Sequence, residues 1–295
     1  MSLKRQLQGK DMIVAPGVYD PLTALLVEQA GFSSAYISGA SVSYTLLGRP
    51  DLGFVSLSQL ADVVQRIRQR VSLNLIVDAD TGFGNALNVQ QTIRTLEQAG
   101  ANAIQIEDQD MPKRCGHLKG KRLVSGNEMC GKIRAACEAR TDPNTLIIAR
   151  TDALSVIGIE ASLSRAKAYA DAGADLLFVE GLQKQEDIDF MIQGIRQGSS
   201  ARIPLLANMV DGGDPRTQNA QALEAAGFSV AITAGSLARA MVYAAEELLQ
   251  NLHTDGSTIA SKQNMLDFAE LNERLGLAQM LAAGDRYAEQ RGALG

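Results

Sequence analysis

One short pattern recurs four times along the chain and constrains the fold more than any other feature. Each copy is a helix-like segment ending in Ala-Gly, then two or three linking residues, then a short apolar run. The copies are EQAGFSSAYIS at 28–38, EQAGANAIQIED at 97–108, ADAGADLLFVE at 170–180 and EAAGFSVAITA at 224–234. A glycine just past a helix favours the left-handed conformation that ends it. The pattern therefore predicts repeated helix–strand units.

Four further apolar runs lie between these copies: MIVAPG at 12–17, LNLIVDAD at 73–80, NTLIIARTD at 144–152 and IPLLANM at 203–209. Continuous apolar runs are typical of parallel strands buried on both faces. Eight strand-then-helix units in about 250 residues predict an α/β fold, a (β/α)8 TIM-type barrel. An open doubly wound sheet is the alternative, but neither GxGxxG nor GxxxxGK[ST] follows the first strand.

The end of the chain has a different character. Residues 250–262, QNLHTDGSTIASK, resemble a polar linker, and the following residues predict two amphipathic helices. We therefore expect a catalytic barrel over residues 1–250, and a linker with extra C-terminal helices over 251–295. These helices either cap their own barrel or pack on a neighbouring subunit.

Charge and cysteine content exclude several classes of protein. The formal net charge is −5, the pI is about 5.2 and no basic stripe is present, which argues against nucleic acid as a partner. No apolar stretch approaches the ~20 residues that span a membrane. The first apolar segment is too short for a signal peptide, and three cysteines form no disulfide framework. We expect a cytoplasmic protein with reduced thiols.

Polar residues stand where the predicted strands end, which is where TIM-type barrels carry their catalytic groups. They are Tyr36, Ser38, Asp78, Asp80, Glu107, Asp108, Arg150, Asp152, Glu180, Asn208, Ser236 and Arg239. Hard carboxylate ligands without a Cys/His cage suit Mg²⁺ or Mn²⁺. The alternative is that an acid such as Asp78 merely caps the next helix. Arg150 and Arg239 suit an anionic substrate, or else internal ion pairs.

A thiol lies in an unusually cationic stretch. Cys115 follows Lys113 and Arg114 and precedes Gly116 and His117, a setting that favours the thiolate. The chain has only two histidines, so a Ser-His-Asp triad is disfavoured and acid–base work falls to Cys, Tyr or carboxylates. Zinc bound through Cys115 and His117 would need further ligands.

These motifs together resemble the isocitrate lyase/phosphoenolpyruvate mutase superfamily. VDADTGFGN (77–85), IEDQDMPKRCGH (106–117) and ARTDA (149–153) carry the resemblance in this order, and SGASVSYTLLGRPDLGF (38–54) and FVEGL (178–182) extend it. The KRCGH motif is similar to the lyase branch. The resemblance implies a barrel whose extra C-terminal helix is swapped between subunits of a dimer, with two dimers forming a homotetramer.

The same resemblance implies a role for each site residue. Asp78 would bind Mg²⁺ directly, while Asp51, Asp80 and Glu107 would hold its water ligands. Substrate carboxylates would be bound by Ser38, Gly39, Ala40, Gly116, Arg150, Asn208 and Arg239. The catalytic group would comprise Cys115 as proton donor, His117 beside it, and Tyr36 and Glu180 as candidate bases.

The expected reaction is Mg²⁺-dependent carbon–carbon cleavage of a 2-hydroxy acid by a retro-aldol step. We favour a 2-alkylmalate such as 2,3-dimethylmalate, giving pyruvate and a short carboxylic acid. One alternative is 2-methylisocitrate, giving pyruvate and succinate, and another is hydrolysis of oxaloacetate to oxalate and acetate. A barrel retained for ligand sensing is less well supported, because acids, cations and a thiol occur together.

Overall fold

The computed structural model describes residues 1–9, 11–116, 118–209 and 215–292. Contacts divide the chain into two units, Met1–Ala238 and Arg239–Gly295. The sequence analysis placed the boundary between barrel and C-terminal segment after residue 250, but that residue lies inside a helix of the second unit.

The first unit is built on eight parallel strands that pair in chain order and close into a barrel. They are β1 (Ile13–Val18), β2 (Ser34–Ile37), β3 (Asn74–Asp78), β4 (Ala103–Glu107), β5 (Leu146–Thr151), β6 (Leu176–Val179), β7 (Leu205–Asn208) and β8 (Val230–Thr233). Strand β1 pairs with β8, which closes the ring. The TIM-type barrel is confirmed, and the open sheet is excluded.

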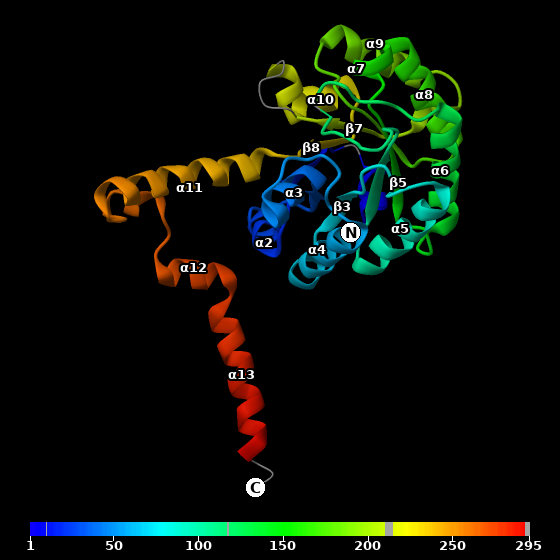
Figure 1. Cartoon of the computed structure of the whole chain (residues 1–295). Coiled ribbons are helices and arrows are strands. Elements are labelled where there is room, and N and C mark those ends of the chain that lie inside the picture. The colour runs from blue at the N-terminus through cyan, green and yellow to red at the C-terminus, as the bar shows by residue number, and fades with distance from the viewer. Residues whose placement is uncertain (10, 117, 210–214, 293–295) are drawn as a thin grey trace. The chain divides into compact units, whose positions relative to one another are not determined.

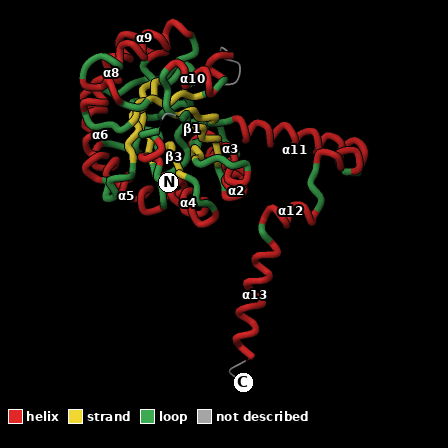
Figure 2. The backbone as a smooth tube through the Cα atoms, turned by 180° about the vertical axis from the view of Figure 1, so that it is seen from behind, coloured by secondary structure: helices red, strands yellow, loops and turns green. Residues whose placement is uncertain are grey.

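Helices surround these strands (Figures 1 and 2). They are α1 (Leu3–Gln6), α2 (Pro21–Gln29), α3 (Gly39–Leu47), α4 (Leu57–Arg70), α5 (Ala86–Ala99), α6 (Gly126–Ala139), α7 (Leu154–Ile157), α8 (Ile159–Asp171), α9 (Gln185–Ile195) and α10 (Ala220–Ala226). Short 3-10 helices occupy Ser199–Arg202 and Pro215–Gln218. In α4, buried Leu60, Val63, Val64 and Ile67 recur at helical spacing, so one face packs inward.

The four recurring glycines end helices as the sequence predicts. Gly31, Gly100, Gly173 and Gly227 have φ of 88°, 106°, 110° and 106°. This left-handed region costs glycine little, because it has no Cβ. Each glycine turns the chain from a helix into the next strand, so the repeated pattern brings the chain back to the barrel four times.

The second unit consists of α11 (Ser236–Asp255, which begins at the end of the first unit), a 3-10 helix (Ile259–Asn264), α12 (Phe268–Leu275) and α13 (Leu277–Gly292). The expected linker from residue 250 is only partly correct. Helix α11 continues to Asp255 and ends before Gly256, whose φ is 63°. The two helices predicted after the linker are present. No helix in the described part of the chain is long and apolar enough to cross a membrane.

Candidate active site

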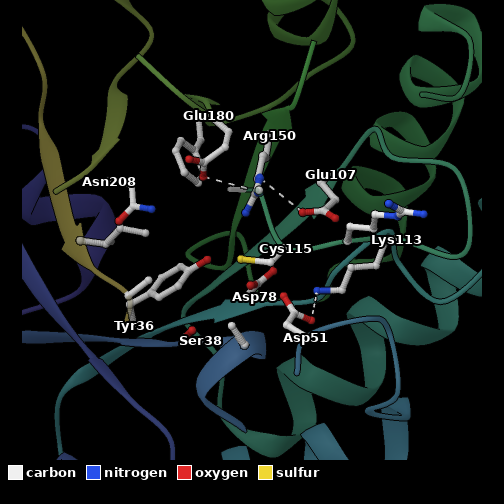
Figure 3. A pocket seen from close by; sticks show the side chains of 16 residues that line it. Tyr36, Ser38, Asp51, Asp78, Glu107, Lys113, Cys115, Arg150, Glu180 and Asn208 are labelled. Atoms are coloured by element: carbon white, nitrogen blue, oxygen red, sulfur yellow. Dashed lines mark ion pairs between the residues drawn. The ribbon is translucent and has the colours of Figure 1, made fainter. Parts of the chain in front are cut away.

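A small cavity lies where the strands end (Figure 3). It is lined by Tyr36, Ser38, Ala40, Asp51, Asp78, Glu107, Lys113, Arg114, Cys115, Gly116, Arg150, Phe178, Glu180, Asn208, Ile232 and Ala234. Most of the residues singled out from the sequence are therefore brought together. Their elements, β2 through β8, are far apart in sequence and meet only because the barrel closes.

Gly39, Asp80, His117 and Arg239 are not among the described lining residues. Gly39 and Asp80 are buried next to Asp78 but do not line the cavity: the Gly39 amide donates to Asp78 Oδ2 at 3.3 Å, and the Asp80 amide donates to Asp78 Oδ1 at 3.2 Å. The Gly39 amide, expected to bind substrate, is thus directed at a carboxylate. His117 lies outside the described residues. Arg239 belongs to the second unit, so its role stays a prediction.

Asp78 is held in one orientation from three sides. Besides those two amides, Gln105 Nε2 donates to Asp78 Oδ1 at 3.0 Å, and Tyr36 Oη donates to Gln105 Oε1 at 3.0 Å. Gln105 is fully buried. It was missed by the sequence analysis, although a lone amide inside an apolar strand was a usable signal. Burial, and then Asp78, raises the pKa of Tyr36 well above its usual range, which keeps the phenol protonated.

Glu107 offers the best test of whether a cation fits here. Its Oε2 lies 3.3 Å from Arg150 Nε, but its Oε1 is buried and has no hydrogen-bond partner within the described residues. Burial raises the pKa of Glu107 well above its usual range, against the lowering effect of Arg150. A buried, unsatisfied carboxylate oxygen is costly unless something else satisfies it. A divalent cation or its water ligand at the cavity would do so.

The carboxylates do not form a closed cage. Among residues that the structure describes, no three His, Cys, Asp or Glu side chains converge as a direct metal-binding group. Asp51, Asp78 and Glu107 nevertheless line one cavity. This arrangement fits an ion such as Mg²⁺, which keeps several waters and takes only one or two direct carboxylate ligands.

Lys113 is the main site residue whose position the sequence did not predict. Its side chain is 3% exposed, and its Nζ lies 2.5 Å from Asp51 Oδ1 and 2.6 Å from Asp80 Oδ1. The sequence suggested a cation that acts on the neighbouring thiol, whereas the structure directs it to the carboxylates. Burial raises the pKa of Asp80 to about 7, although Lys113 acts in the opposite direction.

Arg150 stands at the centre of a buried charge network. Its guanidinium makes two contacts with Asp152, with Nε–Oδ2 at 3.0 Å and Nη2–Oδ1 at 3.1 Å. It also forms ion pairs with Glu107 and with Glu180, the latter with Nη2–Oε2 at 3.5 Å. It lies over the Phe178 ring at 5.2 Å. The internal ion pairs predicted as one alternative are present. Arg150 also lines the cavity, and its contact with an anionic substrate stays a prediction.

The thiol is carried by the segment after β4 that covers the cavity. The Cys115 amide donates to the Asp51 carbonyl at 3.2 Å. The Gln109 side chain fixes Arg114 twice, donating to its carbonyl at 2.8 Å and accepting from its amide at 2.9 Å. Farther along, Lys121 donates to the Gly116 carbonyl and pairs with Asp152 at 3.0 Å. The backbone on both sides of Cys115 is therefore held by hydrogen bonds.

Gly116 is required by close packing. A Cβ at this position would overlap Arg150 Nη2 and would lie 2.8 Å from Glu180 Cγ. Both neighbours are buried and paired with each other, so neither can withdraw cheaply.

Gly116→Ala should therefore lower kcat/KM about 100-fold, because small displacements of catalytic groups have effects of this size. Turnover of the preferred substrate and the thermal midpoint should be measured together. Gly126→Ala, where an added Cβ meets nothing within 4 Å, is the matched control and should retain activity. Equal activity in the two variants would contradict the close-packing argument.

Asp108 follows Glu107 but does not line the cavity. It is fully buried, and its Oδ2 accepts from Thr151, Arg165 and Tyr169 at 2.7, 2.9 and 2.8 Å. Its Oδ1 accepts from the Asp152 amide at 2.9 Å. This carboxylate joins the ends of β4 and β5 to α8, so its role is structural.

Asp108→Ala should lower the free energy of unfolding by about 3–5 kcal/mol, since it leaves Arg165 without its buried carboxylate. Chemical denaturation would measure this change. Asp62→Ala, which breaks an exposed i,i+4 pair with Arg66, should lower it by less than about 1 kcal/mol. Similar losses in the two variants would argue against a structural role for Asp108.

Comparison with known proteins shows which family of proteins this chain is similar to. Residues 3–253 match the phosphoenolpyruvate phosphomutase family. The chain belongs to this family. It is 38% identical over 290 residues to 2,3-dimethylmalate lyase of Eubacterium barkeri, covering 98% of each chain. It is 44% identical over 255 residues to 2-methylisocitrate lyase of Aeropyrum pernix, covering 86% of this chain and 80% of the relative.

Solved structures of the family superimpose closely. Oxaloacetate acetylhydrolase with the inhibitor 3,3-difluorooxalacetate has a TM-score of 0.90 at 31% identity, over 97% of this chain and 96% of the other. Phosphonopyruvate hydrolase with oxalate and Mg²⁺ has a TM-score of 0.86 at 30% identity, over 97% and 98%. The expectation of an enzyme of the isocitrate lyase/phosphoenolpyruvate mutase superfamily is confirmed.

Proposed function

We propose that the protein is a Mg²⁺-dependent carbon–carbon lyase that cleaves a 2-alkylmalate such as 2,3-dimethylmalate. The observation that carries this proposal is the meeting of buried carboxylates, the Arg150 guanidinium and the Cys115 thiol around one cavity. The near full-length similarity to a 2,3-dimethylmalate lyase supports the choice of substrate.

Four carboxylates would hold the metal. Asp78 would bind it directly, and Asp51, Asp80 and Glu107 would hold its water ligands, with Mn²⁺ as a possible substitute. The unsatisfied Glu107 Oε1 and the three hydrogen bonds that orient Asp78 support these roles. When bound, the ion would hold the 2-hydroxyl and its neighbouring carboxylate and make that hydroxyl more acidic. Magnesium in the related phosphonopyruvate hydrolase structure supports this identity.

The protein's own residues would carry out the remaining steps. Arg150, Asn208, and Ser38 and Ala40 at the start of α3 would hold the substrate carboxylates, with Gly116 and Arg239 completing the contact. The Gly39 amide donates to Asp78 instead. Glu180 would take the hydroxyl proton, because the buried Tyr36 phenol stays protonated and donates to Gln105. The C2–C3 bond would then break, and C2 would become the ketone of pyruvate. The electron pair would remain on C3 as a carboxylate-stabilised carbanion, and Cys115 Sγ would protonate it. His117 would lie beside that thiol.

A product-resolved substrate panel tests the proposal. The purified protein with Mg²⁺ should convert 2,3-dimethylmalate to pyruvate and propionate. The 44% identity to a 2-methylisocitrate lyase favours a second candidate, which would release pyruvate and succinate from 2-methylisocitrate. The fold similarity to oxaloacetate acetylhydrolase favours a third, which would release oxalate and acetate. Formation of oxalate without any pyruvate would contradict a lyase.

We also propose a cytoplasmic homotetramer in which the helices of the second unit pack against another subunit. Its support is that many large apolar side chains of this unit are exposed, among them Tyr243, Leu249, Phe268, Met280 and Leu281. Exposed apolar surface of this kind marks interfaces. Light scattering should give a mass near four times 31.4 kDa, and a monomeric mass would contradict the assembly. The three cysteines, none in a disulfide, support the location.

A further inference from the structure

We propose that Lys113 is a tethered cation that competes with the divalent metal for Asp51 and Asp80, and thereby couples metal binding to the position of residues 113–116. This inference rests on the proposed metal site. It adds a residue that neither the motifs nor the family resemblance assigned to the metal.

The first support is geometric. The Lys113 ammonium touches two carboxylates at once, 2.5 Å from Asp51 Oδ1 and 2.6 Å from Asp80 Oδ1, with 3% of its side chain exposed (Figure 3 shows the pair with Asp51). The two carboxylates are themselves 8% and 11% exposed. Lysine rarely becomes this buried unless its charge is paired. The ammonium thus sits among the oxygens that would hold the metal's waters.

The second support is charge balance. Asp51, Asp78 and Glu107 line the cavity and Asp80 adjoins it, so a metal-free site would bring several negative charges together in a buried place. Burial disfavours a charged lysine, yet the ammonium lies 2.5 Å from Asp51 Oδ1 and 2.6 Å from Asp80 Oδ1. The same carboxylates that keep Lys113 charged would attract a divalent ion, and two cations this close repel each other.

The third support is the covalent link to the thiol. Lys113 stands two residues before Cys115, and the Cys115 amide donates to the carbonyl of the same Asp51 whose carboxylate binds Lys113. The segment 113–116 is therefore attached to Asp51 by a side-chain contact and a backbone contact. Withdrawal of the ammonium from Asp51 and Asp80 would remove one of these attachments and loosen the thiol segment, which Gln109 and Lys121 would still hold.

A purely structural ion pair would behave differently. If Lys113 only stabilised the fold, its removal would lower the thermal midpoint and leave metal affinity unchanged or weaker. If it competes with the metal, its removal tightens metal binding. The sign of the change in affinity therefore separates the two interpretations.

The test measures Mn²⁺ binding by electron paramagnetic resonance on the full chain and three variants. Lys113→Met should bind Mn²⁺ about tenfold more tightly, because a like charge is removed next to the ligands. Lys113→Arg retains the charge and should bind Mn²⁺ about as tightly as the unaltered protein does. Lys119→Met removes the same charge from an exposed position six residues further along the chain and should change the dissociation constant less than about twofold.

A second measurement needs no substitution. Alkylation of Cys115 by iodoacetamide, followed by peptide mass spectrometry, should become several-fold faster in the unaltered protein when Mn²⁺ is added without substrate. In Lys113→Met the rate should be high already and insensitive to Mn²⁺. Weaker or equal Mn²⁺ binding by Lys113→Met, or a rate that Mn²⁺ does not change in the unaltered protein, would overturn the inference. If the unaltered protein bound no Mn²⁺ at all, the proposed metal site would be wrong, and the proposed competition by Lys113 would fall as well.

Discussion

Cys115→Ser is expected to lower kcat by about 10²–10⁴-fold, the range that positioned acid–base groups contribute. The thiol lines the cavity together with Arg150 and Glu180, where a carbanion formed from the substrate would need a proton. A serine hydroxyl fills nearly the same space but is a far weaker acid than a thiol. Single-turnover measurements with 2,3-dimethylmalate should show that bond cleavage or product formation is slowed while substrate binding is kept.

Cys130→Ser is the matched control for this substitution. The Cys130 thiol lies on α6 and donates to the Ala168 carbonyl at 3.6 Å, a contact that a hydroxyl can replace. This variant should retain nearly full turnover. If Cys115→Ser turned over every acid of the substrate panel at the unaltered rate, Cys115 would not be the proton donor.

Asp78→Asn is expected to weaken Mg²⁺ binding by at least about 100-fold, and to lower activity by a similar factor at limiting metal. The side chain accepts from Gln105 and the Asp80 amide through Oδ1 and from the Gly39 amide through Oδ2. An asparagine oxygen can keep the first two contacts, but the NH2 group would face the Gly39 N–H and the charge would be lost. Calorimetric titration with Mg²⁺ would measure the affinity directly. Removal of metal with EDTA should abolish activity, and added Mg²⁺ should restore it.

Asp110→Asn separates this local effect from a general change in charge. Asp110 is 47% exposed at its side chain and pairs with Arg122 at 3.2 Å. The variant should bind Mg²⁺ nearly as well as the unaltered protein. Full activity of the EDTA-treated protein would rule out the metal role of Asp78 and its neighbours.

The fold could be predicted because its signals are local. A glycine after each of four helices has a positive φ wherever the helix stops, whatever surrounds it. The continuous apolar run from Leu146 to Ala149 indicates a strand buried on both faces, and β5 is such a strand. The boundary of α11 was less predictable. Polar residues after Gln250 resemble a linker, but nothing in them breaks a helix before Gly256.

Much of the candidate site could also be predicted, for a topological reason. Parallel strands in a closed barrel all end at the same rim. Residues such as Asp78, Arg150 and Asn208 are therefore expected to meet, and all three line the cavity.

The contacts of each side chain could not be predicted, because they depend on direction and on distant partners. Glu107 and Asp108 are neighbours in sequence, but Glu107 lines the cavity while Asp108 binds Arg165 of α8. Successive side chains at a strand end point to opposite faces. Lys113 lies two residues from Cys115 in sequence, yet its ammonium pairs with Asp51 and Asp80.

The sequence by itself therefore determined the repeated helix–strand units, the barrel and the set of residues at its rim, because these follow from local conformation and from strand order. Only the tertiary structure decided which carboxylates face the cavity, which are satisfied by Arg165 or Arg150, and where the Lys113 ammonium lies. The physical reason is that a buried charge takes its place from the partners that surround it in space, and most of those partners are distant in the chain.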